Sequence, residues 1–309
     1  MTAPQPVAAR PEWMARAERG SATALALMSW FSLRFGRRLS RLVLPFITLY
    51  FALTASAARR ASAQYLTRCL GRPAGFADVL RNIYAFAATV HDRVYLLNDR
   101  HELFDLRGEG LDLLDAHGTQ RGGVFLFGAH LGSFEALRSV AREHPLLQVY
   151  MAMYPDNARR VNRALAAINP RATQHIIELG RVDAMLVMHE RLQEGATVGV
   201  LADRASGADE FHRVEFLGAP AAFPSGPFRM AALLRRPVYF MTALYRGGNR
   251  YELHIELLAD LSQPPAGREA AARDLLGRYV ATLERHCRSA PYNWFNFYDF
   301  WDGAHAPAN

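Results

Sequence analysis

A histidine and a glutamate five residues apart are the side chains of this sequence best spaced to do chemistry. His130 follows the apolar run 124–127, and Glu135 follows Gly132 and Ser133. The run predicts a buried strand, and Ser133 is a suitable N-cap for a helix with Glu135 in its first turn. Because Gly132 allows the chain to change direction, the carboxylate can reach the imidazole. We therefore expect His130 to act as a general base whose ring Glu135 orients.

The spacing by itself is weak evidence, because His189 and Glu194 repeat it. That second pair lies beside a segment, 182–192, with apolar residues at helical spacing. Five helical steps turn two side chains about 140° apart, so we interpret it as a solvated helix face. For His130 and Glu135 the plain alternative is a histidine at a strand end and a glutamate that favours a helix start.

Composition limits the class of protein. The 309 residues, half of them hydrophobic, can bury one large core with a small appendage. All 36 basic residues are Arg and the net charge is +7, which suits an anionic membrane surface, a phosphorylated substrate or nucleic acid. The basic residues are dispersed rather than clustered with aromatics, which counts against nucleic acid. Cys69 and Cys287 are far apart, so we expect neither a disulfide framework nor a metal site.

The N-terminal region has the character of a membrane anchor. We expect residues 1–20 to be a loose leader without a cleavable signal peptide. Residues 42–58 carry no charge, and arginines flank them on both sides. A helix of that length spans about 26 Å, which is short for a hydrocarbon core of ~30 Å. With the apolar stretch 22–35 it forms either an anchor or a helical pair lying in the interface, and a buried core helix is the alternative. We assign 21–60 to a membrane-anchoring helical segment.

The remainder alternates between strand and helix patterns, which predicts an α/β domain over residues 61–303 and a tail over 304–309. We expect a mixed, mostly parallel sheet flanked by helices. Residues 62–118 have a helical and mixed pattern, and 251–258 alternates like an edge strand antiparallel to its neighbour. The other expected strands are 124–127, 147–154, 175–179, 197–202, 214–217 and 238–245, and the expected helices are 134–143, 158–168, 183–193, 226–234 and 268–288.

Several further residues are candidates for binding a ligand. Asp203 and Arg204 follow a buried strand, where open α/β sheets place ligands, although Arg204 could equally form a surface salt bridge. Ser225 precedes a helix and binds a phosphate or simply caps that helix. Arg163 shares one predicted helix with Arg159 and Arg160; the three receive an acidic carrier protein or form a solvated face. The aromatic segment 292–301 lines an acyl groove or belongs to the core.

Taken in order, these segments resemble the lipid A biosynthesis (late) acyltransferases of the wider lysophospholipid acyltransferase superfamily. The resemblance covers roughly residues 20–302. It rests on the N-terminal apolar segment, on Gly128 to Glu135 as an HxxxxE motif, and on the order and spacing of the segments 153–157, 195–204, 214–220, 224–227 and 236–238.

Two positions depart from the family pattern. Pro155 stands where those enzymes usually have Arg, and the segment 294–298 replaces their Trp-Leu-His-Arg-Arg ending. Both departures count against the lipid A precursor as the acceptor. The pattern is closer to a divergent branch found with aryl-polyene pigment and other lipid clusters.

The resemblance implies acyl transfer from acyl carrier protein or coenzyme A to a hydroxyl of a membrane lipid, without a further cofactor or metal. It implies an inner-membrane protein with a cytoplasmic catalytic domain, and as partners a membrane-lipid acceptor, acyl carrier protein and an anionic membrane surface, but no nucleic acid. His130 and Glu135 then carry the catalysis, with backbone N–H groups of residues 132–134 as oxyanion donors. The residues expected to contact substrate are Gly132, Ser133, Asp203, Arg204, Ser225 and Arg163.

Two other classes stay open at this point. The first is an acyl-ester hydrolase with Ser133 as nucleophile, although the Gly-x-Ser-x-Gly elbow is missing. The second is a non-enzymatic protein that binds anionic membranes through its positive charge.

Overall fold

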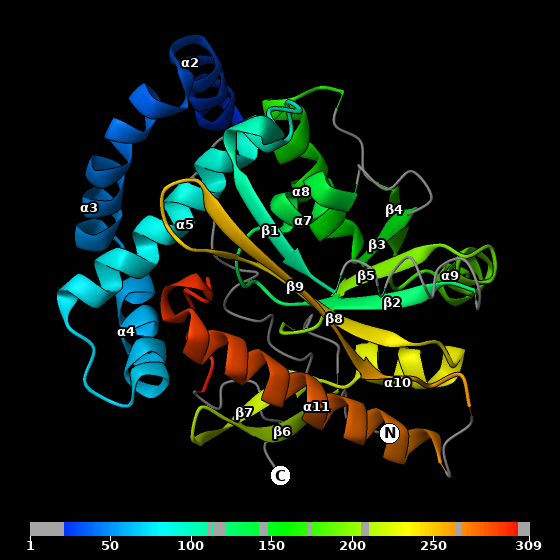
Figure 1. Ribbon diagram of the computed structural model, residues 1–309. Coiled ribbons are helices and arrows are strands. Elements are labelled where there is room, and N and C mark those ends of the chain that lie inside the picture. Colours follow the sequence, from blue (N-terminus) through cyan, green and yellow to red (C-terminus); the bar gives the residue numbers. More distant parts are fainter. Residues whose placement is uncertain are drawn as a thin grey trace, which may run out of the picture.

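A central sheet with helices on both faces carries the site (Figure 1). The computed structural model describes residues 22–110, 113, 122–141, 148–171, 175–204, 210–263 and 267–301. The expected leader, 1–20, and the expected tail, 304–309, lie outside the described residues.

The main sheet has seven strands in the order β1-β9-β8-β2-β5-β3-β4. All neighbouring strands are parallel except β8 and β9, which are antiparallel. The predicted mixed, mostly parallel sheet is therefore confirmed. The strands are β1 (Asp105–Glu109), β2 (Val124–Gly128), β3 (Val149–Met153), β4 (His175–Glu178), β5 (Thr197–Leu201), β8 (Val238–Tyr245) and β9 (Arg250–Ala259).

Two strand predictions need correction. The segment at β9 is antiparallel to β8 as expected, but it is not an edge strand, because β1 pairs along its other side. β1 has the sequence Asp-Leu-Arg-Gly-Glu, whose exposed polar residues gave no strand signal. A second, two-stranded ribbon joins β6 (Phe211–Phe216) to β7 (Ala219–Pro224), of which only part of β6 was expected.

The pleat of the buried strands assigns their side chains to two helical layers. In β2, Phe125 and Phe127 pack into the core that includes α10 and α11, whereas Val124 and Leu126 pack beneath α7. Figure 1 shows α7 and α8 on the opposite side of the sheet from α10 and α11. The helices are α5 (Phe76–Leu96), α7 (Phe134–Ala141), α8 (Pro155–Ile168), α9 (Ala184–Gln193), α10 (Gly226–Leu234) and α11 (Arg268–Ser289).

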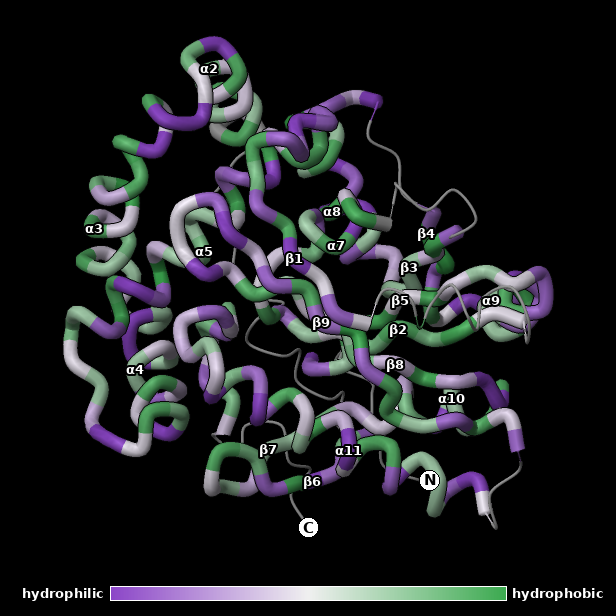
Figure 2. The backbone as a smooth tube through the Cα atoms, viewed as in Figure 1, coloured by the Kyte–Doolittle hydropathy of each residue, from purple (hydrophilic) through white to green (hydrophobic). Residues whose placement is uncertain are grey.

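The N-terminal helices stand along one side of this body. They are α2 (Ala22–Ser40), which is kinked at Gly36, then α3 (Leu44–Thr54) and α4 (Ser56–Leu70). α3 packs against α5 and leaves large apolar side chains uncovered, including Phe46 at 74% and Leu53 at 60% exposure. The mainly hydrophobic colouring of α3 is visible in Figure 2.

Within the described residues, no single helix is both long and apolar enough to cross a membrane. One bent pair, 25–54 with 56–70, meets that test by length and composition, and its two arms meet at 97°.

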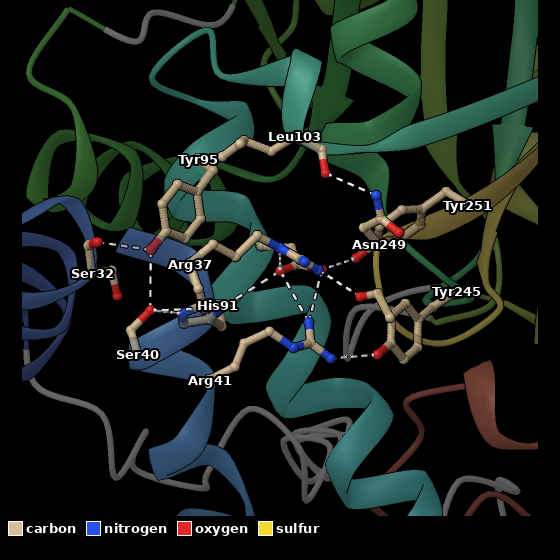
Figure 3. A network of polar contacts seen from close by, with 12 residues as sticks. Ser32, Arg37, Ser40, Arg41, His91, Tyr95, Leu103, Tyr245, Asn249 and Tyr251 are labelled. Carbon is tan, nitrogen blue, oxygen red and sulfur yellow. Dashed lines mark hydrogen bonds and ion pairs between the residues drawn. The ribbon is translucent and has the colours of Figure 1, made fainter. Parts of the chain in front are cut away.

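A buried carboxylate attaches α2 to the body of the protein. Asp92 on α5 has no exposed side-chain surface and accepts two hydrogen bonds from Arg37, at 2.8 and 2.9 Å. Arg41 contacts it at 3.3 Å, and the Tyr251 hydroxyl donates to it at 2.8 Å. Burial raises the pKa of Asp92, but His91 and the two guanidinium groups outweigh burial and lower it overall. Figure 3 shows Arg37 from α2, Arg41 from the 3₁₀ turn that follows it, His91 from α5 and Tyr251 from β9 converging on one point.

Replacing Asp92 with Asn is expected to lower the free energy of unfolding by about 3–5 kcal/mol, because two nearly buried arginines lose their counter-charge. Denaturant unfolding of the purified full chain in detergent measures this. Asp274→Asn, which breaks the exposed pair with Arg278, is the control and should cost under about 1 kcal/mol. Equal losses in the two variants would show that the cluster at Asp92 is not specially stabilising.

Candidate active site

The candidate catalytic histidine lies at the carboxyl end of β2 and contacts a carboxylate at the end of the neighbouring strand. His130 Nδ1 lies 2.9 Å from Asp203 Oδ1, and the His130 backbone N–H donates to Asp203 Oδ2, also at 2.9 Å. The strands β2 and β5 are parallel and adjacent, with Gly128 in register with Leu201. Their exits therefore lie side by side, which brings together two residues far apart in sequence.

Asp203 is held by three donors in a buried setting. It is 1% exposed, and besides its two contacts with His130 it accepts a hydrogen bond of 3.1 Å from the Trp294 indole. Burial raises the pKa of Asp203, but His130, Arg204 and the donated hydrogen bonds outweigh burial and hold that pKa well below its usual range. Asp203 is therefore ionised at neutral pH.

The ionised partner determines how the imidazole is protonated. A carboxylate only accepts hydrogen bonds, so Nδ1 must carry the proton and Nε2 keeps its lone pair. Burial and the nearby Arg204 charge lower the pKa of His130 more than Asp203 raises it. The ring is consequently neutral at pH 7. Since a third of its side-chain surface is exposed, the imidazole can meet a substrate.

Backbone hydrogen bonds hold the segment after His130 on both sides. The Phe295 N–H donates to the His130 carbonyl at 2.8 Å, and the Gly132 N–H donates to the Asn293 carbonyl at 2.9 Å. On the other side, the Ser133 N–H donates to the Ala243 carbonyl of β8 at 2.8 Å. The chain at the site is thus enclosed between β8 and residues 293–295.

Gly132 is required by this enclosure. Its φ is +73°, and a Cβ there would lie 2.0 Å from the Ala243 carbonyl oxygen. A side chain at this position would be strained by the dihedral angle and would also clash with backbone. The expected change of chain direction at Gly132 is therefore present.

Glu135 is placed differently from the expectation. Its carboxylate forms an ion pair of 2.8 Å with Arg93 Nε on α5 and is 8% exposed. Among the described contacts, there is no hydrogen bond or ion pair between His130 and Glu135. His130 contacts Asp203 instead. Glu135 lies in the first turn of α7, as predicted, and its side chain joins α7 to α5.

The expected oxyanion and phosphate donors are largely occupied. The N–H groups of Gly132 and Ser133 donate to backbone carbonyls, and the Ser133 hydroxyl accepts from the Ala136 N–H at 3.3 Å as a helix cap does. Ser225 directs both its N–H and its hydroxyl to the Glu210 carbonyl, at 2.8 and 3.1 Å. The third N–H group expected to bind an oxyanion, that of Phe134 at the start of α7, donates in none of the hydrogen bonds just described.

The two candidate arginines have different positions. Arg204 follows Asp203 directly, donates to the Phe295 carbonyl at 2.8 Å and lies over the Tyr298 ring at 5.4 Å. Its Nε is buried without a hydrogen-bond partner. Arg163 is exposed on α8 together with Arg159 and Arg160. Because β5 separates β3 from β2 in the sheet, α8 begins two strands away from the strand that leads to His130.

Sequence reasoning did not find the contribution of residues 293–294 to the site. Asn293 donates to the Tyr245 carbonyl and accepts from the Tyr245 N–H, which fixes the segment on the end of β8. Trp294 is fully buried, with Tyr65 and Phe216 at its ring, and supports Asp203 through its indole N–H. The only signal in the sequence was an aromatic-rich segment, which a core explains equally well.

A family model described as bacterial lipid A biosynthesis acyltransferase matches residues 23–301. A comparison with curated proteins finds no match to the chain. The family match spans α2, the whole sheet and residues 293–295, so it includes every residue that holds His130 in place.

Gly132→Ala is expected to destabilise the fold and to displace His130, because neither the dihedral angle nor the space admits a Cβ. Thermal unfolding of the full chain measures the loss, for which we expect at least about 2 kcal/mol. Gly277→Ala is the matched control: it lies in α11 with no atom within 4 Å of the added Cβ, and helix propensity should make it neutral or stabilising. A Gly132→Ala protein as stable as Gly277→Ala would contradict the enclosed geometry.

Proposed function

Because this chain belongs to the bacterial lipid A biosynthesis acyltransferase family, we propose that it transfers an acyl group from a thioester to a hydroxyl of a membrane lipid. The thioester is carried by acyl carrier protein or coenzyme A. The observation that carries the proposal is the partly exposed His130 imidazole held at Nδ1 by the buried Asp203 carboxylate.

In the proposed reaction, His130 Nε2 removes the proton of the acceptor hydroxyl as its oxygen attacks the thioester carbonyl. A new C–O bond forms, and the tetrahedral intermediate collapses with cleavage of the C–S bond. The imidazolium then returns its proton to the departing thiolate. Asp203 stabilises the imidazolium between these steps and keeps Nε2 directed at the substrate. No covalent acyl-enzyme is required, because the thioester is already activated.

The surroundings of His130 suit charged substrates. Arg204 lies beside the pair, and its positive charge favours an anionic group near His130. We propose the Phe134 N–H at the start of α7 as an oxyanion donor. We keep the exposed arginines of α8, with Arg163 among them, as the contact for an acidic carrier protein.

The exposed apolar face of α2 and α3 supports a membrane-lipid acceptor. Side chains such as Phe46 and Leu53 would be covered by lipid if these helices lay in the interface. We propose that the protein works at the inner membrane, with its catalytic domain on the cytoplasmic side. With the departures at Pro155 and 294–298, the proposed acceptor is a membrane lipid of either kind, the lipid A precursor or a pigment-type lipid.

A hydrolase using Ser133 fits the geometry less well. The Ser133 side chain is almost fully buried and caps α7 through its hydroxyl. A nucleophile must instead present its oxygen to a base and to the substrate.

Substitutions of His130 and Ser133 separate the two mechanisms. His130→Ala should lower acyl transfer about 10²- to 10⁴-fold, because the general base is lost. Ser133→Ala should leave transfer within about tenfold of wild type and cost stability through the lost cap. Mass spectrometry of lipids from cells that express each variant measures the product as a mass increase of one acyl group. Full acylation with His130→Ala, or none with a folded Ser133→Ala protein, would contradict the proposed roles.

The pH dependence follows from the lowered pKa of His130. The neutral ring is the active form, so kcat/KM should be constant near pH 7 and fall only below pH 6.5, as the imidazole gains a proton. Initial rates with an acyl thioester and a lipid acceptor measure the midpoint of this fall in kcat/KM. They are taken between about pH 5 and 8, a range that brackets the ordinary histidine pKa. A midpoint above the ordinary histidine value would contradict the lowered pKa of His130.

Asp203 and Glu135 can be told apart through the same titration. Asp203 raises the pKa of His130, so Asp203→Asn should move that pKa further down, whereas Glu135→Gln should leave it in place. NMR of ring-labelled histidine, with His130→Gln to assign the signal, measures both without needing activity. A larger shift for Glu135→Gln would return the ring-orienting role to Glu135.

A further inference from the structure

A groove of about 910 Å³ lies between α3, α5, the β8–β9 turn and the end of α11. Its volume is within the range of pockets that bind small ligands. Asn293 forms part of its wall, and the backbone of the same residue accepts the Gly132 N–H, so the groove lies next to the segment that follows His130. His130 itself does not line it.

The lining is basic. Arg41, Arg81 and Arg246 contribute to it, and none of the described residues that line it is acidic. Tyrosine hydroxyls accompany these arginines: Arg41 donates to Tyr245 at 2.7 Å, and Arg81 contacts the Tyr292 hydroxyl at 3.4 Å.

The ion pairs around the groove leave an excess of positive charge. Arg41 shares Asp92 with Arg37, and Arg81 shares Asp78 with Arg72. Arg246 pairs with Glu252 alone. Five arginines are thus paired with three carboxylates, which leaves two positive charges beside the groove. Dianionic or monoanionic phosphate complements such a surface.

The network in Figure 3 holds Arg41 in position. Its guanidinium is fixed between Asp92 and Tyr245, and its side chain is 14% exposed. An arginine fixed in this way loses little conformational freedom when it binds a ligand. Arg81, by contrast, is 65% exposed at the rim and can close on a ligand.

One wall of the groove is apolar and continues onto the surface of α3. Pro45, Leu49 and Leu80 line it. Leu49 is also 45% exposed and belongs to the same helix as the uncovered Phe46 and Leu53. A ligand whose anionic end lies among the arginines could therefore direct an alkyl chain along α3 toward the uncovered apolar face.

We propose that this groove binds a glycerophospholipid of the bilayer, with its phosphate among Arg41, Arg81 and Arg246 and an acyl chain along α3. The site is separate from the catalytic histidine, and it seats the protein on the bilayer at a fixed distance from His130.

Titration of the purified full chain with short-chain phosphatidylglycerol, in a zwitterionic detergent and without acyl donor, tests this site. Arg81→Glu should weaken binding at least about tenfold, the effect of losing a charged hydrogen-bond donor. Arg181→Glu is the matched control, because Arg181 is 61% exposed and also ion-paired, at the turn between β4 and α9. It should change binding less than about twofold. Because no turnover is measured, the result is independent of the proposed acyl transfer.

Three outcomes overturn the proposal. Equal weakening by Arg81→Glu and Arg181→Glu would show general charge attraction instead of a site. Equal affinity for the lipid and for glycerophosphoglycerol, which has the headgroup without chains, would show a site for soluble phosphate esters. Absence of binding to the wild-type chain would exclude the site.

Arg81→Gln removes the charge without reversing it and should also weaken binding. Thermal unfolding shows whether each variant is folded.

Discussion

The hydrogen bond between the His130 imidazole and the Asp203 carboxylate is the interaction on which the arrangement of the site depends. It needs two strands that run in the same direction and end at the same level, as β2 and β5 do. It also needs a carboxylate that stays ionised although it is buried. That condition is met because the backbone of His130, the ring of His130 and the Trp294 indole all donate to it. A buried charge with fewer partners would be costly and would take up a proton instead.

The sequence predicted the local features of this site, but it did not predict which carboxylate pairs with His130. His130 at a strand exit, Gly132 at the change of direction and Asp203 at the end of a buried strand were all predicted, because each has a short-range signature. The pairing of Asp203 with His130 was not, since it depends on strand order: β5 inserts between β2 and β3, and chain order alone does not reveal that. Glu135 was preferred because it is near in sequence. In the folded chain the Glu135 carboxylate on α7 instead pairs with Arg93. β1 was missed for a related reason, as its pairing with β9, and not its composition, makes it a strand.

The N-terminal arginines show how one pattern can serve two surroundings. In the sequence, the basic residues before the uncharged stretch 42–58 had the character of flanking charges at a membrane. In the structure, Arg37 and Arg41 point inward and are held by a carboxylate of α5, while the apolar side chains of α3 point outward. Arg37 and Arg41 thus lie on the protein side of this region, whereas the largest apolar side chains of α3 lie on its outer side.

The enclosure of His130 by residues 293–295 has a consequence for the order of events during protein synthesis. β2 and the turn at Gly132 leave the ribosome early. Residues 293–295, which complete the hydrogen bonds of that turn, are translated much later. Until they arrive, the Gly132 N–H and the His130 carbonyl lack their partners, and the Trp294 donor to Asp203 is missing. The hydrogen bonds that residues 293–295 supply around His130 therefore form only after most of the chain, including the apolar α3, has emerged.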